Sequence, residues 1–358
     1  MMRRRVEAGA AAALTLIVLW LASAAGQSTP PAFTFDPAWP RPLPNGWQVG
    51  PVSGIATDAR DAIWLTHRTE PVKQAGGAPA PPVLVLDQSG AVVQSWGGPG
   101  AGYDWPEQVH GISVDPRDRV WISGNGEPDS FILAFTRTGS FVRQIGRRGQ
   151  KGGSNDTANV GRATQMRFAG TEVFVSDGEM NQNHRVIVFD AETGAYKRHW
   201  GAYGARPDDA AVPAARFDPK APPPRQFGSA VHCLRIDRDG LVYVCDRGNN
   251  RFQVFRQDGT FVREAFIARE TPGTGSVWDI EFSPGQQEYL YVADGGNQKI
   301  WVLRRDTLEV VTSFGEAGKE PGRFATSLHD ITVDSKGNLY TGEAAAAGRV
   351  QRFLLKGR

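Results

Sequence analysis

An internal repeat constrains the fold of this chain more than any other feature of its 358 residues. Each copy contains an apolar strand that ends in Asp or a substitute, a polar turn, and a second apolar strand with alternating side chains. Five copies begin at Ser53, His110, His232, Trp278 and His329, and a shorter copy covers Gln165–Asp177. A third strand follows in most copies, and then a fourth strand that usually starts with Gly.

Four short strands repeated six times predict an all-β fold, a six-bladed β-propeller. The last copy ends after its third strand, Val350–Leu355. We expect Ala32–Asp36 to supply the missing fourth strand, because an open ring would leave a sheet edge and one blade face uncovered. A single propeller domain would then cover residues 26–358.

The N-terminal segment has the pattern of a cleavable secretory signal. Three Arg precede an apolar run, Ala11–Ala22, and small residues follow it, which predicts a signal peptide over residues 1–25. A retained anchor is the alternative, although the run is short for a membrane span. Without residues 1–25, 37 of the 40 basic and 37 of the 38 acidic side chains remain. This balance of charge favours neither nucleic acid nor a membrane as a partner. We expect the mature protein to be secreted or periplasmic, and to be a monomer.

The chain has two Cys, Cys233 and Cys245, on either side of a hairpin signal and equally distant from Asp239. They can therefore face each other across two paired strands. An oxidising compartment would favour a cross-strand disulfide, and two buried free thiols fit the same spacing.

Three of the six His lie at the same place in the repeat, five residues before the Asp that ends the first strand. They are His110, His232 and His329, in the second, fourth and sixth copies. Alternate blades of a six-fold ring lie about 120° apart and the first strand lines the channel, so these side chains should meet on the axis. Three imidazoles with an open fourth position predict a metal site, with zinc as the expected ion. Iron, cobalt or manganese fits the same geometry, and three hydrogen-bonded channel histidines are the alternative without a metal.

Residues just past the second strands should lie on the same face as the three histidines. Arg68 and Arg247 hold matching positions in blades three apart, so they should face each other across the channel. Two guanidinium groups beside a metal favour a substrate with a carboxylate; two surface arginines paired with local Asp residues are the alternative. Glu179, in the third copy, is a candidate general base, and a solvated loop carboxylate is its alternative.

Single repeats resemble NHL repeats, for example Val244–Phe252. The chain from about Trp47 onwards resembles the peptidyl-α-hydroxyglycine α-amidating lyase family. The matching pieces are Thr66-His-Arg68, Val109-His-Gly-Ile112, Val175-Ser-Asp-Gly178, Cys245-Asp-Arg247 and Leu328-His-Asp-Ile331.

The resemblance implies zinc on His110, His232 and His329, active-site roles for Arg68 and Arg247, and a structural calcium ion at Asp330. It also implies cleavage of an N-acyl-α-hydroxyglycine into an amide and glyoxylate. The chain departs from the family at Glu179, where the family has a tyrosine that assists deprotonation.

Two other functions compete with a lyase. A non-catalytic NHL-type propeller would bind a protein or glycan partner and would hold a structural metal or none. A lactonase-like hydrolase would bind calcium through carboxylate and Asn ligands, and the three histidines argue against it.

Overall fold

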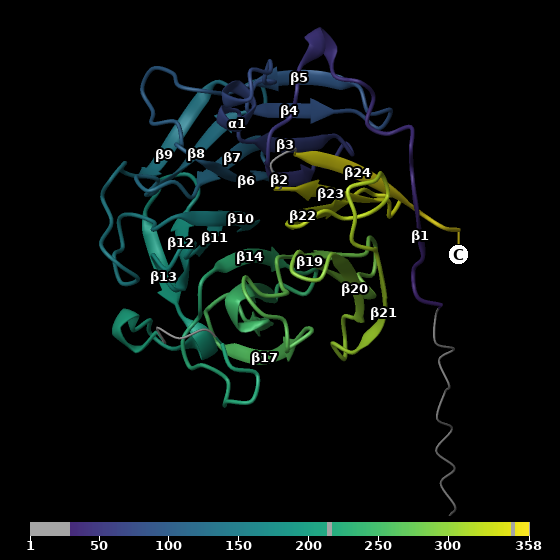
Figure 1. The fold of residues 1–358 in the computed structure, drawn as a ribbon. Coiled ribbons are helices and arrows are strands. Elements are labelled where there is room, and N and C mark those ends of the chain that lie inside the picture. The colour runs from purple at the N-terminus through teal and green to yellow at the C-terminus, as the bar shows by residue number, and fades with distance from the viewer. Residues whose placement is uncertain (1–28, 213–216, 345–347, 358) are drawn as a thin grey trace, which may run out of the picture.

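The structure is a computed structural model that describes residues 29–212, 217–344 and 348–357. Six antiparallel sheets of four strands each are arranged around an axis (Figure 1), so the protein is an all-β, six-bladed β-propeller, as predicted. The signal peptide predicted over residues 1–25 lies outside the described residues. Within the described ranges, no helix is both long and apolar enough to span a membrane.

The strands of each blade run in chain order from the channel outwards, except in blade 6. Blade 1 contains β2 (Val52–Thr57), β3 (Ile63–His67), β4 (Val83–Leu86) and β5 (Val92–Trp96). Blade 2 contains β6 (Val109–Val114), β7 (Arg119–Gly124), β8 (Phe131–Thr136) and β9 (Phe141–Gly146). Blade 3 contains β10 (Ala163–Ala169), β11 (Glu172–Asp177), β12 (Arg185–Asp190) and β13 (Tyr196–Trp200).

Blade 4 contains β14 (Val231–Ile236), β15 (Val242–Asp246), β16 (Arg251–Phe255) and β17 (Phe261–Phe266). Blade 5 contains β18 (Asp279–Phe282), β19 (Tyr289–Asp294), β20 (Lys299–Arg304) and β21 (Val310–Phe314). Blade 6 contains β22 (Leu328–Val333), β23 (Leu339–Glu343), β24 (Arg349–Leu355) and, outermost, β1 (Phe33–Phe35). The helical segments are α1 (Glu70–Gln74) and the 3₁₀ turns η1 (Pro44–Gly46), η2 (Ala202–Gly204), η3 (Asp209–Ala211) and η4 (Arg247–Asn249).

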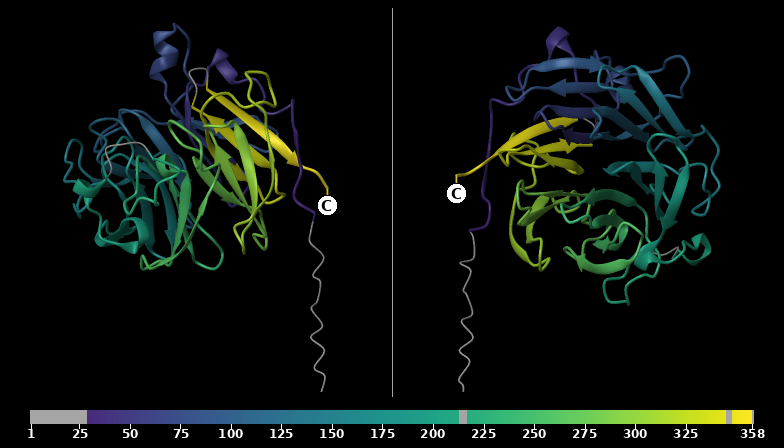
Figure 2. Two further views of the ribbon diagram at one scale, coloured as in Figure 1. Left: turned by 60° about the horizontal axis from the view of Figure 1, so that its bottom comes forward. Right: turned by 180° about the vertical axis from the view of Figure 1, so that it is seen from behind.

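The N-terminal strand closes the ring, as the sequence predicts. Strand β1 pairs with β24, with Phe33 opposite Leu355, and the purple N-terminal segment passes next to the end of the yellow β24 in Figures 1 and 2. The Phe33 ring stacks on Phe314 of blade 5, with ring centroids 4.9 Å apart. The first and last segments of the fold therefore complete one blade together and cover the face of its neighbour.

The Asp that follows the first strand of blades 1 and 2 accepts a hydrogen bond from the Trp of the next strand. Asp58 accepts a hydrogen bond from Nε1 of Trp64 at 2.9 Å, and Asp115 accepts the equivalent bond from Trp121 at 3.0 Å. Asp58 also accepts backbone N–H groups of its own turn. One carboxylate thus fixes both the hairpin turn and the aromatic side chain of the next strand.

The innermost strands of every blade except blade 5 carry a β-bulge near their start. The pairing register shifts between Val109 and Ile112 in β6 and between Leu328 and Asp330 in β22. A bulge breaks the strict alternation of side chains, so two successive residues can face the same side of a sheet. Both His329 and Asp330 consequently contact residues of other blades across the channel.

Strands β14 and β15 are joined by a disulfide between Cys233 and Cys245, whose Cα atoms lie 4.8 Å apart. Both residues are fully buried between blades 4 and 5. Of the two alternatives that the sequence leaves open, the structure contains the cross-strand disulfide.

Candidate metal centre and active site

The three repeat-equivalent histidines meet on the channel axis. His110 lies on β6, His232 on β14 and His329 on β22, and each is at most 5% exposed. One ring nitrogen of each lies within 4.8 Å of the others. The ring centroids are 4.7 to 5.3 Å apart. The repeat symmetry therefore brings these side chains together.

Backbone carbonyls orient two of the rings. Nδ1 of His110 donates to the carbonyl of Thr164 at 3.1 Å, and Nδ1 of His232 donates to the carbonyl of Trp278 at 2.5 Å. Because a carbonyl only accepts, Nδ1 carries the proton and Nε2 keeps its lone pair. Burial lowers the pKa of His110 to about 4 and the pKa values of His232 and His329 well below their usual value. Neutral imidazole is the form that binds a metal ion.

Glu179 stands beside these rings with one oxygen unpaired. Its Oε1 accepts from Nη2 of Arg247 at 2.9 Å. Its Oε2 has no hydrogen-bond partner and lies 3.8 Å from Nε2 of His232, which has none either. Glu179 is 4% exposed, so the loop carboxylate is not solvated. A cation or a shared proton would satisfy these two buried atoms.

Both predicted arginines lie near the histidines. The pKa of His329 is lowered first by burial, then by its histidine neighbours and by the charges of Arg68 and Arg247. Nη2 of Arg68 donates to Asn125 at 3.0 Å, and the Arg247 guanidinium stacks over the Trp278 ring at 4.5 Å. Nε of each arginine is buried without an acceptor. Neither arginine is therefore a surface residue bridged to a local Asp.

The sequence alone did not assign roles to Asn125 and Trp278. Trp278 occupies the histidine position of the repeat in blade 5, and its ring contacts His232 and His329 edge-on at 5.6 and 5.7 Å. That shared position was the available signal. Asn125 follows β7 at the repeat position that Arg68 holds in blade 1 and Arg247 holds in blade 4, so its signal was positional as well.

His67, the residue before Arg68, belongs to the scaffold. Its Nδ1 accepts from the backbone N–H of Gly50 at 3.1 Å, and its Nε2 donates to the carbonyl of Pro81 at 3.0 Å. Both ring nitrogens are used, so His67 is not available as a ligand.

The donor set at the three histidines fits zinc. One nitrogen of each ring lies within 4.8 Å of the others. Nitrogens that bind a tetrahedral zinc ion at 2.0–2.1 Å lie about 3.4 Å apart, so each pair would have to come closer by about 1.4 Å at most. A metal ion also requires a free lone pair on the ligating nitrogen. Nδ1 of His110 and of His232 is held by a hydrogen bond, and Nε2 of His232 is unpaired.

The surroundings of Asp330 do not fit calcium. Its carboxylate accepts from backbone N–H of Ile55 at 3.0 Å and from Nε2 of Gln165 at 3.1 Å, and a nitrogen of Arg235 lies 3.6 Å away. Calcium requires six to eight oxygen ligands, whereas Asp330 faces N–H donors and a guanidinium group. Burial and the neighbouring Asp279 raise the pKa of Asp330 well above its usual value.

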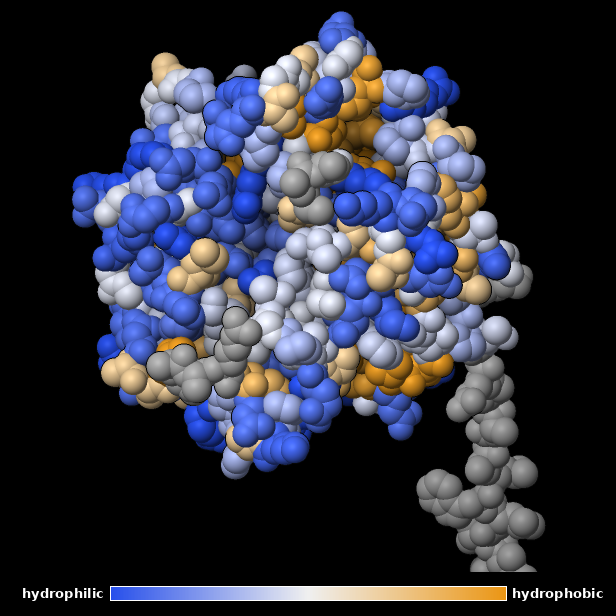
Figure 3. Space-filling model, viewed as in Figure 1, coloured by the Kyte–Doolittle hydropathy of each residue, from blue (hydrophilic) through white to orange (hydrophobic). Residues whose placement is uncertain are grey.

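A cleft lies beside Arg247, which is one of its lining residues. It has a volume of about 690 Å³, and Met180, Phe217 and Pro222 give its wall an apolar character. Figure 3 shows the face seen in Figure 1, with hydrophilic residues around a hollow near the ring centre.

The NHL repeat family model matches residues 231–255. The amidating monooxygenase of Mus musculus (peptidyl-glycine alpha-amidating monooxygenase) is 25% identical over 317 residues, 82% of this chain and 29% of that protein. The peptidyl-alpha-hydroxyglycine alpha-amidating lyase 1 of Drosophila melanogaster is 23% identical over 90% of this chain and 60% of its own length. Human NHL repeat-containing protein 3 is 25% identical over 90% of this chain and 88% of that protein. The chain therefore spans under a third of the monooxygenase and most of the NHL protein.

Two solved structures share the fold. Virginiamycin B lyase from Staphylococcus aureus aligns with a TM-score of 0.51 and 14% identity over 91% of this chain and 90% of that chain. A Bacteroides thetaiotaomicron protein of unknown function aligns with a TM-score of 0.56 and 12% identity over 86% and 70%. The protein is thus a six-bladed propeller with an NHL repeat, distantly related to amidating enzymes and to NHL repeat proteins.

Proposed function

We propose that this protein is a zinc-dependent lyase that cleaves an N-acyl-α-hydroxyglycine-like substrate into an amide and glyoxylate. The observation that carries the proposal is the pair of buried, unpaired lone pairs on Nε2 of His232 and Oε2 of Glu179, 3.8 Å apart within the histidine cluster. His110, His232 and His329 would hold a cation, which would satisfy Nε2 of His232 and leave Oε2 of Glu179 available as a base. The distant amidating relatives support the same reaction.

The chain's own residues have complementary roles. The unpaired Nε donors of Arg68 and Arg247 suit a substrate carboxylate, which accepts from both. Oε2 of Glu179 takes the proton of the α-hydroxyl group, the C–N bond breaks as the carbonyl of glyoxylate forms, and the proton passes to the departing amide nitrogen. Bound zinc supplies Lewis acidity, which makes the hydroxyl proton easier to remove.

The test combines metal analysis with an assay for glyoxylate. We expect about one zinc per chain and release of glyoxylate from α-hydroxyhippurate in equal amount to benzamide. Substitution His232→Ala should abolish both zinc retention and turnover. Zinc-replete protein that releases no glyoxylate from any N-acyl-α-hydroxyglycine contradicts the proposal.

A matched variant separates metal binding from chemistry. Glu179→Gln keeps an oxygen acceptor for Arg247 but cannot take a proton, so we expect kcat to fall roughly 10²–10⁴-fold with zinc retained. An unchanged kcat would remove Glu179 from the mechanism.

A non-catalytic binding module is the second candidate. It is favoured by human NHL repeat-containing protein 3, which matches over most of both chains. A protein that retains no metal after reconstitution would support this function instead.

Export, the monomeric state and the carboxylate-bearing substrate remain predictions.

A further inference from the structure

A buried arginine lies in the channel beside the histidine centre. Arg235 is on β14, three residues after His232, and is 3% exposed. All five of its N–H groups have acceptors, namely Oε2 of Glu281 at 3.3 Å, Oε1 of Gln165 at 2.5 Å, the carbonyl of Leu234 at 3.1 Å, Oδ2 of Asp279 at 2.9 Å and the carbonyl of Ile331 at 3.1 Å. The guanidinium group is therefore saturated and cannot serve as a binding group for a ligand.

The acceptors come from blades on several sides of the channel. Gln165 belongs to blade 3, Asp279 to blade 5 and Ile331 to blade 6, and Arg235 itself belongs to blade 4. The cluster extends to blade 1 through the bond from Ile55 to Asp330. A single cation thus joins five of the six blades at the axis, as a bound metal ion would.

The same cluster is connected directly to the histidines. Gln165 follows Thr164, whose carbonyl orients His110, and Asp279 follows Trp278, whose carbonyl orients His232. Asp330 follows His329 in the sequence. Gln165, Asp279 and Asp330 are therefore each one residue away from a histidine or from a residue whose carbonyl orients one.

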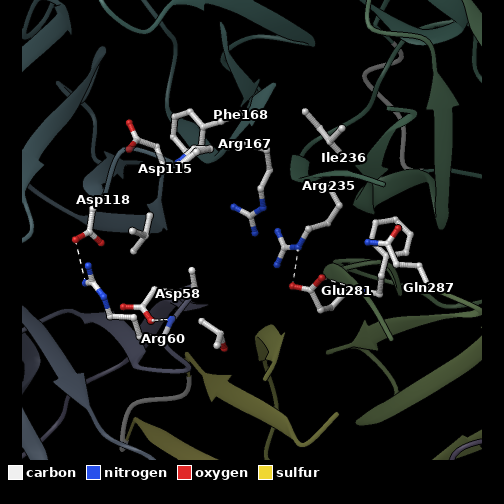
Figure 4. A pocket seen from close by; sticks show the side chains of 15 residues that line it. Asp58, Arg60, Asp115, Asp118, Arg167, Phe168, Arg235, Ile236, Glu281 and Gln287 are labelled. Atoms are coloured by element: carbon white, nitrogen blue, oxygen red, sulfur yellow. Dashed lines mark hydrogen bonds and ion pairs between the residues drawn. The ribbon is translucent and has the colours of Figure 1, made fainter. Parts of the chain in front are cut away.

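Arg235 also reaches the opposite mouth of the channel. A cavity of about 590 Å³ there is lined by Arg235, Glu281 and Arg167 among others. Figure 4 shows the ion pair between Arg235 and Glu281 from this cavity. Gln165 and Asp330, at most 3% exposed, do not line the cavity and lie on the inner side of the cluster.

We propose that Arg235 is a built-in cation that takes the place of a second metal ion in the channel and acts as a positioning residue for the histidine centre. Its guanidinium holds the strands that carry Gln165, Asp279 and Asp330, and these strands fix the orientation of the three imidazoles. The inference rests on the metal site of the proposed function but not on its chemistry.

The first test measures zinc affinity by competition with a chromophoric chelator. Arg235→Met and Arg235→Lys should each raise the zinc dissociation constant about 10-fold or more, because groups that orient metal ligands typically contribute 10–100-fold to affinity. Arg305→Met is the matched control. Arg305 forms an ion pair 2.8 Å long with the buried Asp237, which is not part of the Arg235 cluster. The control should lower the melting temperature and leave zinc affinity unchanged.

The second test needs no variant and is valid even if Arg235→Met fails to fold. Native protein with zinc bound should contain no stoichiometric calcium, and added calcium should not raise its melting temperature. Calcium at one per chain, or a calcium-dependent rise in melting temperature, would overturn the inference. Zinc affinity in Arg235→Lys equal to wild type would overturn it as well, whereas zinc binding without glyoxylate release would overturn only the proposed function. A native protein that binds no zinc would overturn both.

Discussion

His67 illustrates how burial acts on a single side chain in this propeller. The ring is fully buried, and its two nitrogens are divided between one N–H donor and one carbonyl acceptor. That arrangement requires the neutral ring, and burial lowers the pKa to about 4 from the usual 6.5. In the unfolded chain the same imidazole is protonated at a higher pH.

The pH dependence of stability follows from this difference. Because the folded pKa of His67 is depressed, the unfolded state binds the proton first, and stability falls as pH decreases from about 6.5 to 4. At the lower end of that window, this preference of the proton for the unfolded chain lowers the free energy of unfolding by about 3 kcal/mol. Urea unfolding of wild type and His67→Gln at several pH values should show a steeper loss in wild type. Parallel pH profiles for the two proteins would contradict this assignment.

At the scale of elements, blade 4 has a β-bulge in its first strand, β14, which pairs with β15. In β14 the register shifts between Val231 and Leu234, around His232. The disulfide from Cys233 to Cys245 of β15 spans the same place. We infer that the crosslink keeps the bulge, and with it the direction of the His232 ring, fixed relative to β15.

Loss of this disulfide should lower stability. The bond closes a segment of 12 residues, and such a loop gives a stabilisation of about 3 kcal/mol by restricting the unfolded chain. Cys233→Ala/Cys245→Ala should show this loss in denaturant unfolding. Reductant should destabilise wild type and leave the double variant unaffected; equal stability of the two proteins without reductant would contradict the prediction.

At the scale of the whole molecule, the ring depends on one short strand. β1 covers the edge of β24, and the bond between Asp36 and Arg352, 2.5 Å long, anchors its end. Without β1 the edge of β24 and the ring of Phe353 lose their cover. An exposed strand edge is a template for association with another chain.

Truncation tests the closure. A chain that begins after Asp36 should unfold at a lower temperature and self-associate, as measured by thermal unfolding and light scattering. A chain that begins at Pro31 keeps β1 and serves as the control, with stability equal to that of the longer protein. Equal behaviour of the two truncated chains would show that β1 does not close the ring.

The repeat alone determines the number of blades, the closing role of Ala32–Asp36 and the meeting of His110, His232 and His329. These features follow from periodicity, because equivalent residues of a closed ring occupy equivalent places around its axis. The position of Arg68 and Arg247 near the histidines follows from the same argument.

Tertiary structure decides the features that depend on side chains from different blades. The contact of Glu179 with Arg247 and His232 lies in no repeat pattern, because the loop after β11 is irregular. The sequence places a calcium ion at Asp330 by resemblance, whereas the fold fills its surroundings with the guanidinium of Arg235. Packing between strands that are distant in the chain decides which groups at the axis form hydrogen bonds. Periodicity specifies where residues lie around the axis, but not which of their atoms come into contact.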